Sequence, residues 1–98
     1  MSLYQGYLAC YDIQDNKNRK KLFEILKDHG LMPLQESVFW GEITRAEHHA
    51  ILRSTEELLN SDTDKFFMLP FLLTEQILQK GIGYQNIQLR KPDGFVNL

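Results

Sequence analysis

The sequence predicts one small α+β domain, and three observations support this fold class. The chain has 98 residues, a length that rarely divides into two domains. Hydrophobic residues make up 43% of it, which is too large a share for a disordered protein. Apolar stretches typical of strands alternate with stretches of helical period up to residue 73. We therefore expect residues 1–98 to form a single domain, with a core over about 3–73 and a C-terminal tail over about 74–98.

The first predicted strand covers residues 3–13, which are rich in Tyr, Leu, Cys and Ile. It carries no charge before Asp12, and such a run is typical of a buried central strand. Cys10 lies inside this run, so we expect a buried and unreactive thiol.

The first predicted helix follows a polar segment in which Asp15, Asn16 or Asn18 could cap it. Its apolar side chains recur at helical spacing, and they are Leu22, Phe23, Ile25 and Leu26. His29 and Gly30 then provide a C-terminal stop.

The next strand region is 34–43, and it allows two interpretations. A tight turn near Ser37 would divide it into a hairpin, whereas one long strand could instead bend there. No turn signal of the Gly-Asn type precedes Gly41, so both interpretations stay open.

A second helix begins at Thr44, because Glu47 three residues later completes a capping box. Its expected inner face, before residues 60–62 end the helix, is Ala50, Ile51, Leu52, Thr55, Leu58 and Leu59.

The last third of the chain predicts further strands. Residues 66–73 are strongly apolar, and Pro70 favours an edge position or a strand end. Residues 85–90 alternate as a short strand, and 94–98 are a candidate for one more.

Strand, helix and strand, repeated twice, is the plan of the ferredoxin-like or split βαβ fold. That plan requires two strands between the helices, which 34–43 would have to supply. We expect this fold with an additional C-terminal strand, in a homodimer where two β-sheets meet.

Composition excludes several classes of protein. A single cysteine makes no internal disulfide, and no ligand lies near it at metal-binding spacing. Apolar stretches are far shorter than the roughly 20 residues of a membrane span, and no secretion signal is evident. We therefore expect a cytoplasmic protein that does not bind membranes.

The net charge is −2, but positive charge is concentrated at one place. Five consecutive positions contain Lys17, Arg19, Lys20 and Lys21, whereas the charged residues within 44–76 are mostly acidic. One end of the fold should be basic and the other acidic. The basic cluster is either a solvated helix face or a surface that binds nucleic acid.

Asp12 ends an apolar central strand and precedes a polar loop, a position where α/β arrangements hold ligands. It could equally be a turn or capping aspartate. One carboxylate is a poor metal site, because Mg²⁺ usually needs one or two carboxylates besides phosphate and water. Two copies of Asp12 facing each other across a dimer axis would form one such site.

These residues resemble the second core protein of CRISPR adaptation, the small non-integrase partner in spacer acquisition. The resemblance covers residues 6–71 and depends on the order and spacing of Tyr11-Asp12-Ile13, a polar loop, Arg19, Gly30-Leu31, Gln35, Ser37-Val38-Phe39 and Gly41-Glu42.

The resemblance implies a ferredoxin-like homodimer whose C-terminal strand packs on the partner's sheet. It implies a dimer that bridges two integrase dimers and holds the spacer-precursor DNA. It also implies a possible Mg²⁺- or Mn²⁺-dependent endonuclease that acts on duplex DNA or single-stranded RNA, with one metal site at the dimer axis.

Carried over by position, Asp12 corresponds to the catalytic, metal-binding aspartate and Arg19 to a basic functional residue. Lys21 stands where many members have arginine, a change that keeps the charge but loses bidentate phosphate contacts. With Lys17 and Lys20, these two residues form the expected nucleic-acid surface.

The resemblance assigns structural motif positions to Tyr11, Ser37 and Phe39. The chain departs from the family at Pro33, where relatives have a basic residue, and at Glu36, where an aromatic residue is common. Both changes make this area more negative and count against cleavage of nucleic acid.

Other motifs point to structure. His48 and His49 are adjacent on a predicted helix, where neighbours point about 100° apart, so we expect that they do not share a ligand. Trp40 and the pair Phe66-Phe67 are expected in the core or a dimer contact, although base stacking is the alternative. Residues 81–83 lack the lysine of a phosphate-binding loop.

Two other functions stay open from the residues. One is a toxin-type ribonuclease of the same fold, and the other is a regulatory dimer that binds a small molecule. The basic cluster beside Asp12 favours nucleic acid over a small molecule.

Overall fold

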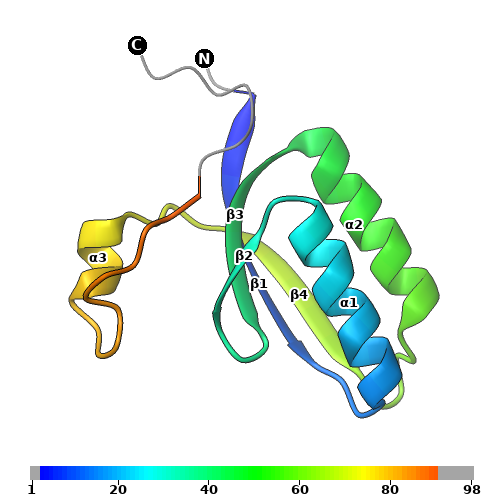
Figure 1. Cartoon of the computed structure of the whole chain (residues 1–98). Helices are drawn as coiled ribbons and strands as arrows, with labels where there is room; N and C mark the ends of the chain where they lie inside the picture. Colours follow the sequence, from blue (N-terminus) through cyan, green and yellow to red (C-terminus); the bar gives the residue numbers. More distant parts are fainter. Residues whose placement is uncertain (1–2, 91–98) are drawn as a thin grey trace.

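The computed structural model describes residues 3–90. These residues form four strands and three helices, in the order β1 (Tyr4–Asp12), α1 (Asn16–Asp28), β2 (Met32–Gln35), β3 (Val38–Thr44), α2 (Arg45–Leu58), β4 (Lys65–Pro70) and α3 (Glu75–Gln79). The strands form one antiparallel sheet in the order β2-β3-β1-β4. Figure 1 shows α1 and α2 side by side on one face of this sheet. The predicted ferredoxin-like α+β fold is confirmed.

The first strand is central, as its charge-free sequence predicts. β1 pairs with β3 along one edge and with β4 along the other. Its residues alternate between the sheet faces, so Tyr7, Ala9 and Tyr11 are buried beneath the helices while Leu8 and Cys10 face away from them.

Helix α1 begins where the polar segment after β1 supplies a cap. The Asp15 carboxylate accepts a hydrogen bond of 2.9 Å from the backbone N–H of Asn18, so Asp15 is the cap among the three candidates. Leu22 and Leu26 are fully buried against the sheet. The helix ends before His29, and Gly30 has a φ of 90°, which glycine adopts without strain.

The segment between the helices is a hairpin and not a bent strand. β2 and β3 are joined by Glu36 and Ser37, and Ser37 has a φ of 65° in the left-handed region. The Ser37 carbonyl accepts a hydrogen bond of 3.1 Å from the backbone N–H of Tyr11, which ties the turn to the central strand. Because serine is an uncommon residue for this conformation, the sequence contains no recognisable turn signal here.

Helix α2 begins with the predicted capping box. The Thr44 hydroxyl accepts from the backbone N–H of Glu47 at 3.2 Å, and the Glu47 carboxylate accepts from the N–H of Thr44 at 3.1 Å. Ile51 and Thr55 are buried as predicted. Leu52 was predicted on the inner face, but its side chain is 39% exposed because it lies at the border of the buried stripe.

Strand β4 is an edge strand that ends at Pro70, as the proline predicts. Beyond it the chain turns away, and Thr74 caps the short helix α3, which the sequence pattern did not predict. In Figure 1, α3 stands on the far side of the sheet from α1 and α2.

The predicted strand over 85–90 is wrong, because these residues form no strand. No sheet edge pairs with them. Their backbone is held instead by a bond of 2.8 Å from the N–H of Leu89 to the Glu75 carboxylate, and the Tyr84 hydroxyl contacts Gln35 at 3.0 Å. The alternation of side chains that predicted a strand therefore occurs here in a segment that pairs with no neighbouring strand. The predicted last strand, 94–98, lies outside the described residues.

The described part of the chain contains no helix that combines the length and apolar character needed to cross a membrane.

Candidate nucleic-acid interface and carboxylate site

Asp12 is the last residue of β1 and lies at the end of the sheet where the β1–α1 loop begins. Its side chain is exposed on the same face as Leu8 and Cys10, with Lys65 of β4 opposite in the strand register. No hydrogen bond or ion pair to the described residues occupies its carboxylate. The oxygens of this carboxylate are therefore available to a ligand.

The residues around Asp12 fit a divalent cation only in part. Hard cations such as Mg²⁺ bind carboxylate oxygens, and Asp12 supplies an accessible one. The described residues of one chain contain no cluster of three His, Cys, Asp or Glu side chains that could hold a metal ion. A site at Asp12 would thus need oxygens from a second copy of the chain, from substrate and from water.

Arg19 has a structural role as well as a charge. Its guanidinium donates a hydrogen bond of 2.9 Å to the carbonyl of Ile13 and a second one to the side-chain oxygen of Asn16. The side chain is half-buried, so Arg19 fixes the loop that follows Asp12. Its replacement would alter the loop as well as the charge.

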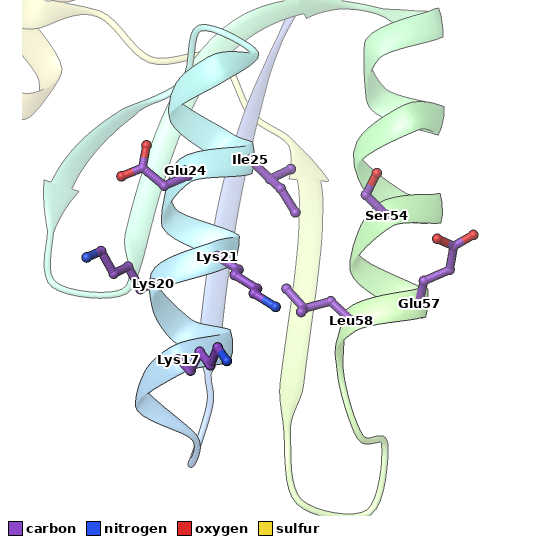
Figure 2. Close-up of a pocket in the computed structure, with 8 residues that line it drawn as sticks. All are labelled: Lys17, Lys20, Lys21, Glu24, Ile25, Ser54, Glu57 and Leu58. Atoms are coloured by element: carbon purple, nitrogen blue, oxygen red, sulfur yellow. The ribbon is translucent and has the colours of Figure 1, made fainter.

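The three lysines of the basic cluster are exposed and lie on α1 in different directions. Figure 2 shows Lys21 directed toward α2 and Leu58, whereas Lys20 projects from the other side of α1. Lys17 and Lys21 line a hollow of about 770 Å³ between the helices, which Glu57 of α2 also lines. The positive surface is therefore strongest at the start of α1 and weakens toward α2.

The position of these lysines along α1 is electrostatically unfavourable for the helix. The first turn of α1 contains no acidic residue, although the N-terminal end of a helix carries partial positive charge. Lys17 lies in that first turn and adds to the charge, which the N-cap carboxylate of Asp15 partly offsets, and Lys20 and Lys21 follow in the second turn. This concentration of positive charge favours an anionic ligand over a merely solvated surface.

The remaining predicted residues lie on the opposite face from Asp12. Tyr11 and Phe39 are buried beneath the helices, and the Tyr11 hydroxyl hydrogen-bonds to the Ser37 side chain. Burial raises the pKa of Tyr11, and the hydrogen bond to Ser37 and the nearby Arg19 oppose that rise. The predicted site residues thus lie on both faces of the sheet, close to the end of β1.

Sequence reasoning missed Asp64, which directly precedes β4 and supports the β1–α1 loop. Its carboxylate is only 8% exposed and accepts hydrogen bonds of 3.1 Å from the backbone N–H groups of Gln14 and Asn60. An aspartate in a polar loop carries no sequence signal for such a long-range contact.

The two adjacent histidines of α2 lie close to each other, with His48 half-buried and His49 exposed. His48 and His49 line the same hollow, with ring centroids 5.8 Å apart. The length of the imidazole side chains brings the two rings together despite their angular separation on the helix. The expectation that they do not share a ligand stays a prediction.

Comparison with known proteins identifies relatives over nearly the whole chain. Residues 5–80 match the family model described as CRISPR associated protein Cas2. A protein of Francisella tularensis subsp. novicida (strain U112), named CRISPR-associated endoribonuclease Cas2 1, is 40% identical over 95 residues, which are 97% of each chain. A Desulforudis audaxviator protein named CRISPR-associated endoribonuclease Cas2 is 31% identical over 75 residues, 76% of this chain and 71% of that protein.

Solved structures show the same fold. A hypothetical protein from Thermus thermophilus superposes with a TM-score of 0.66 at 29% identity, covering 70% of this chain and 83% of that one. Cas2 from Streptococcus pyogenes superposes with a TM-score of 0.62 at 22% identity, covering 78% and 94%.

Proposed function

Because this chain belongs to the Cas2 family of CRISPR-associated proteins, we propose that it acts in spacer acquisition as a homodimer. The dimer bridges two integrase dimers in the cytoplasm and holds the spacer-precursor DNA between them. The observation that carries this proposal is the apolar face of the sheet that α1 and α2 leave uncovered.

That open face has the character of an interface. Phe67 and Leu69 of β4 are 49% and 51% exposed, and they lie opposite Cys10 and Leu8 of β1 in the strand register. Contiguous apolar side chains of this kind rarely stay in contact with water in a monomer. A second copy of the same face would bury them and bring two Asp12 residues to one interface.

The basic start of α1 supports the DNA-holding role. Two copies of Lys17, Lys20 and Lys21 would supply up to six positive side chains, arranged with two-fold symmetry. Each phosphate contact with B-DNA contributes roughly 0.9 to the slope of log K against log salt. Binding should therefore be strongly dependent on salt.

The test is capture of a duplex by the protein mixed with its integrase. A variant with Lys17→Glu, Lys20→Glu and Lys21→Glu should stay dimeric by light scattering, bind the duplex more weakly and show a shallower salt slope. Lys27→Glu, at the other end of α1, is the matched control and should bind nearly as the wild type does. A triple variant with the wild-type slope would contradict the role of this surface.

A second candidate function is metal-dependent cleavage of RNA or DNA, and the accessible Asp12 carboxylate favours it. Asp12 from each of two copies would hold Mg²⁺ or Mn²⁺, which when bound polarises a phosphate and activates water. The loop held by Arg19 and Asp64 would position the carboxylate. The names of the relatives, which include the word endoribonuclease, agree with this activity.

Asp12→Asn separates the two candidates, because it keeps the size of the side chain and removes its charge. We expect it to abolish metal-dependent cleavage while dimer formation and duplex capture persist. Cleavage at the wild-type rate would place the activity elsewhere or in a contaminant. Loss of duplex capture in a dimeric variant would mean that holding DNA also depends on the carboxylate.

A further inference from the structure

A second hollow lies beside the first turns of α2, above the N-terminal half of β1. Its volume is about 570 Å³, and it is lined by Arg45, His48 and His49 of α2 and by Tyr4, Gln5 and Tyr7 of β1. In Figure 1 the start of α2 lies at the opposite end of the helical layer from the start of α1. This hollow is therefore separate from the lysine surface described above.

The three α2 side chains converge because of their spacing. Arg45, His48 and His49 occupy positions i, i+3 and i+4, which lie on one side of a helix. The His48 ring stacks on Tyr7, with centroids 4.3 Å apart and an interplanar angle of 23°. His48 is thus held in place, whereas Arg45 and His49 are exposed and can adjust to a ligand.

Charge distinguishes this hollow from others on the described surface. No carboxylate lines it, whereas acidic side chains line three other hollows: Glu24 and Glu57, Glu24 and Glu36, and Glu56 and Asp64. The nearest acidic residue along α2, Glu47, is engaged with Thr44 and lies 3.6 Å from His29. An anion entering the hollow would therefore meet positive or neutral donors only.

We propose that this hollow binds a phosphoryl group, either free in solution or at the end of a nucleic acid. The Arg45 guanidinium offers a planar pair of donors that matches phosphate oxygens. The two imidazoles add donors from the same helix face, and Gln5 adds an amide from the strand below. The proposal does not depend on the function proposed above, because it concerns different residues.

The electrostatics predict how binding responds to pH. Burial, and to a smaller extent the neighbouring His49, lower the pKa of His48. The other titratable groups lining the hollow are Tyr4 and Tyr7 from β1 and Arg45 from α2. A bound anion favours the protonated imidazole, so affinity should rise as pH falls through the lowered pKa of His48.

The experiment is an NMR titration of the folded, isotope-labelled protein. At pH 7, inorganic phosphate should shift the ring signals of His48 and His49 in a saturable way. The double variant Arg45→Gln/His49→Gln should bind at least about tenfold more weakly, since it loses charge-assisted hydrogen bonds. Both positions are exposed, so the remaining spectrum should stay unchanged. Arg53→Gln, elsewhere on α2, is the matched control and should bind as the wild type does.

Absence of saturation with both inorganic phosphate and the 5′-phosphorylated duplex described below, or equal binding by the double variant, would overturn the proposal. Sulfate tests the pH response, because its own charge does not change as the pH is lowered. An affinity for sulfate that does not increase below pH 6.5 would also count against the site. A DNA duplex with 5′-phosphate ends, compared with the same duplex with 5′-hydroxyl ends, identifies the source. Shifts with the phosphorylated duplex alone support a nucleic-acid end, and shifts with inorganic phosphate alone support a free anion.

Discussion

The two faces of the β-sheet differ in how far a single chain buries their apolar side chains. On the covered face, Ala9 and Phe39 are at most 1% exposed beneath α1 and α2. On the open face, Phe67 and Leu69 keep about half of their surface in contact with solvent. The covered face therefore accounts for folding of the single chain, and the open face accounts for its proposed association.

The comparison of the two faces also explains why the predicted site residues are divided between them. Tyr11 points to the covered face, and Asp12, the next residue, points to the open one. A strand alternates its side chains, so one short sequence supplies a buried tyrosine to the core and an exposed carboxylate to a possible interface. Four substitutions or labels would test how independent the two faces are.

The largest effect is expected for Phe39→Ala on the covered face. Phe39 packs edge-on against Phe23 at 5.2 Å, and its removal leaves a cavity in the core. We expect a loss of about 3–5 kcal/mol in the free energy of unfolding, measured by urea denaturation. Phe67→Ala on the open face is the control and should cost far less under conditions that keep the protein monomeric. Equal losses at the two positions would remove the distinction between the faces.

The next effect concerns the open face itself. The double variant Phe67→Glu/Leu69→Glu should fold as the wild type does but lose the dimer. Two carboxylates buried in an apolar contact would weaken association by roughly 30-fold or more. Sedimentation or light scattering across a concentration series measures this, and circular dichroism confirms the fold. An unchanged dimer would place the interface on another surface.

A smaller effect is expected for Gly6→Ala. This substitution tests the part of the open face where the segment after β4, at Phe71, packs against β1. A Cβ atom at Gly6 would lie 2.5 Å from the carbonyl oxygen of Phe71 and 2.7 Å from the Trp40 ring. The Trp40 indole already donates to that carbonyl at 2.9 Å, so neither group can move without cost. We expect destabilisation of about 1–3 kcal/mol in thermal or urea unfolding.

Gln5→Ala, at the exposed neighbouring position, is the control and should change stability by less than about 0.5 kcal/mol. Tolerance of alanine at Gly6 would mean that the segment after β4 moves aside easily. The open face would then extend further along β1.

The smallest effect concerns the reactivity of Cys10, which lies opposite Phe67 on the open face. Burial raises the pKa of Cys10, so a smaller fraction is thiolate at pH 8 than in an ordinary cysteine. Alkylation by iodoacetamide, measured by mass spectrometry, should be a few-fold slower than for a peptide thiol, and the difference should shrink as pH rises past the raised pKa. The rate should fall further at protein concentrations that favour the dimer. A rate independent of concentration, with the dimer present, would exclude Cys10 from the interface.

The candidate site could be predicted from the sequence only as a set of residue types. Asp12 and the lysines were recognisable because charge follows an apolar strand and then accumulates within five positions. The loop-holding contacts of Arg19 and Asp64 were not recognisable, because they join residues that are distant in the chain or depend on backbone carbonyls. The shared hollow of His48 and His49 also required the tertiary structure, since helix angle alone suggested that the rings diverge.

By itself, the sequence determined the order of strands and helices up to Pro70, except whether residues 34–43 form one strand or two, since local period, capping residues and proline act over a few positions. Asp15, the Thr44–Glu47 box and Pro70 each act where the pattern places them. Only the tertiary structure decided the hairpin at Ser37, because its left-handed backbone is stabilised by a hydrogen bond from the distant Tyr11. It likewise decided that residues 85–90 form no strand, because a strand exists only where a neighbouring edge accepts its hydrogen bonds.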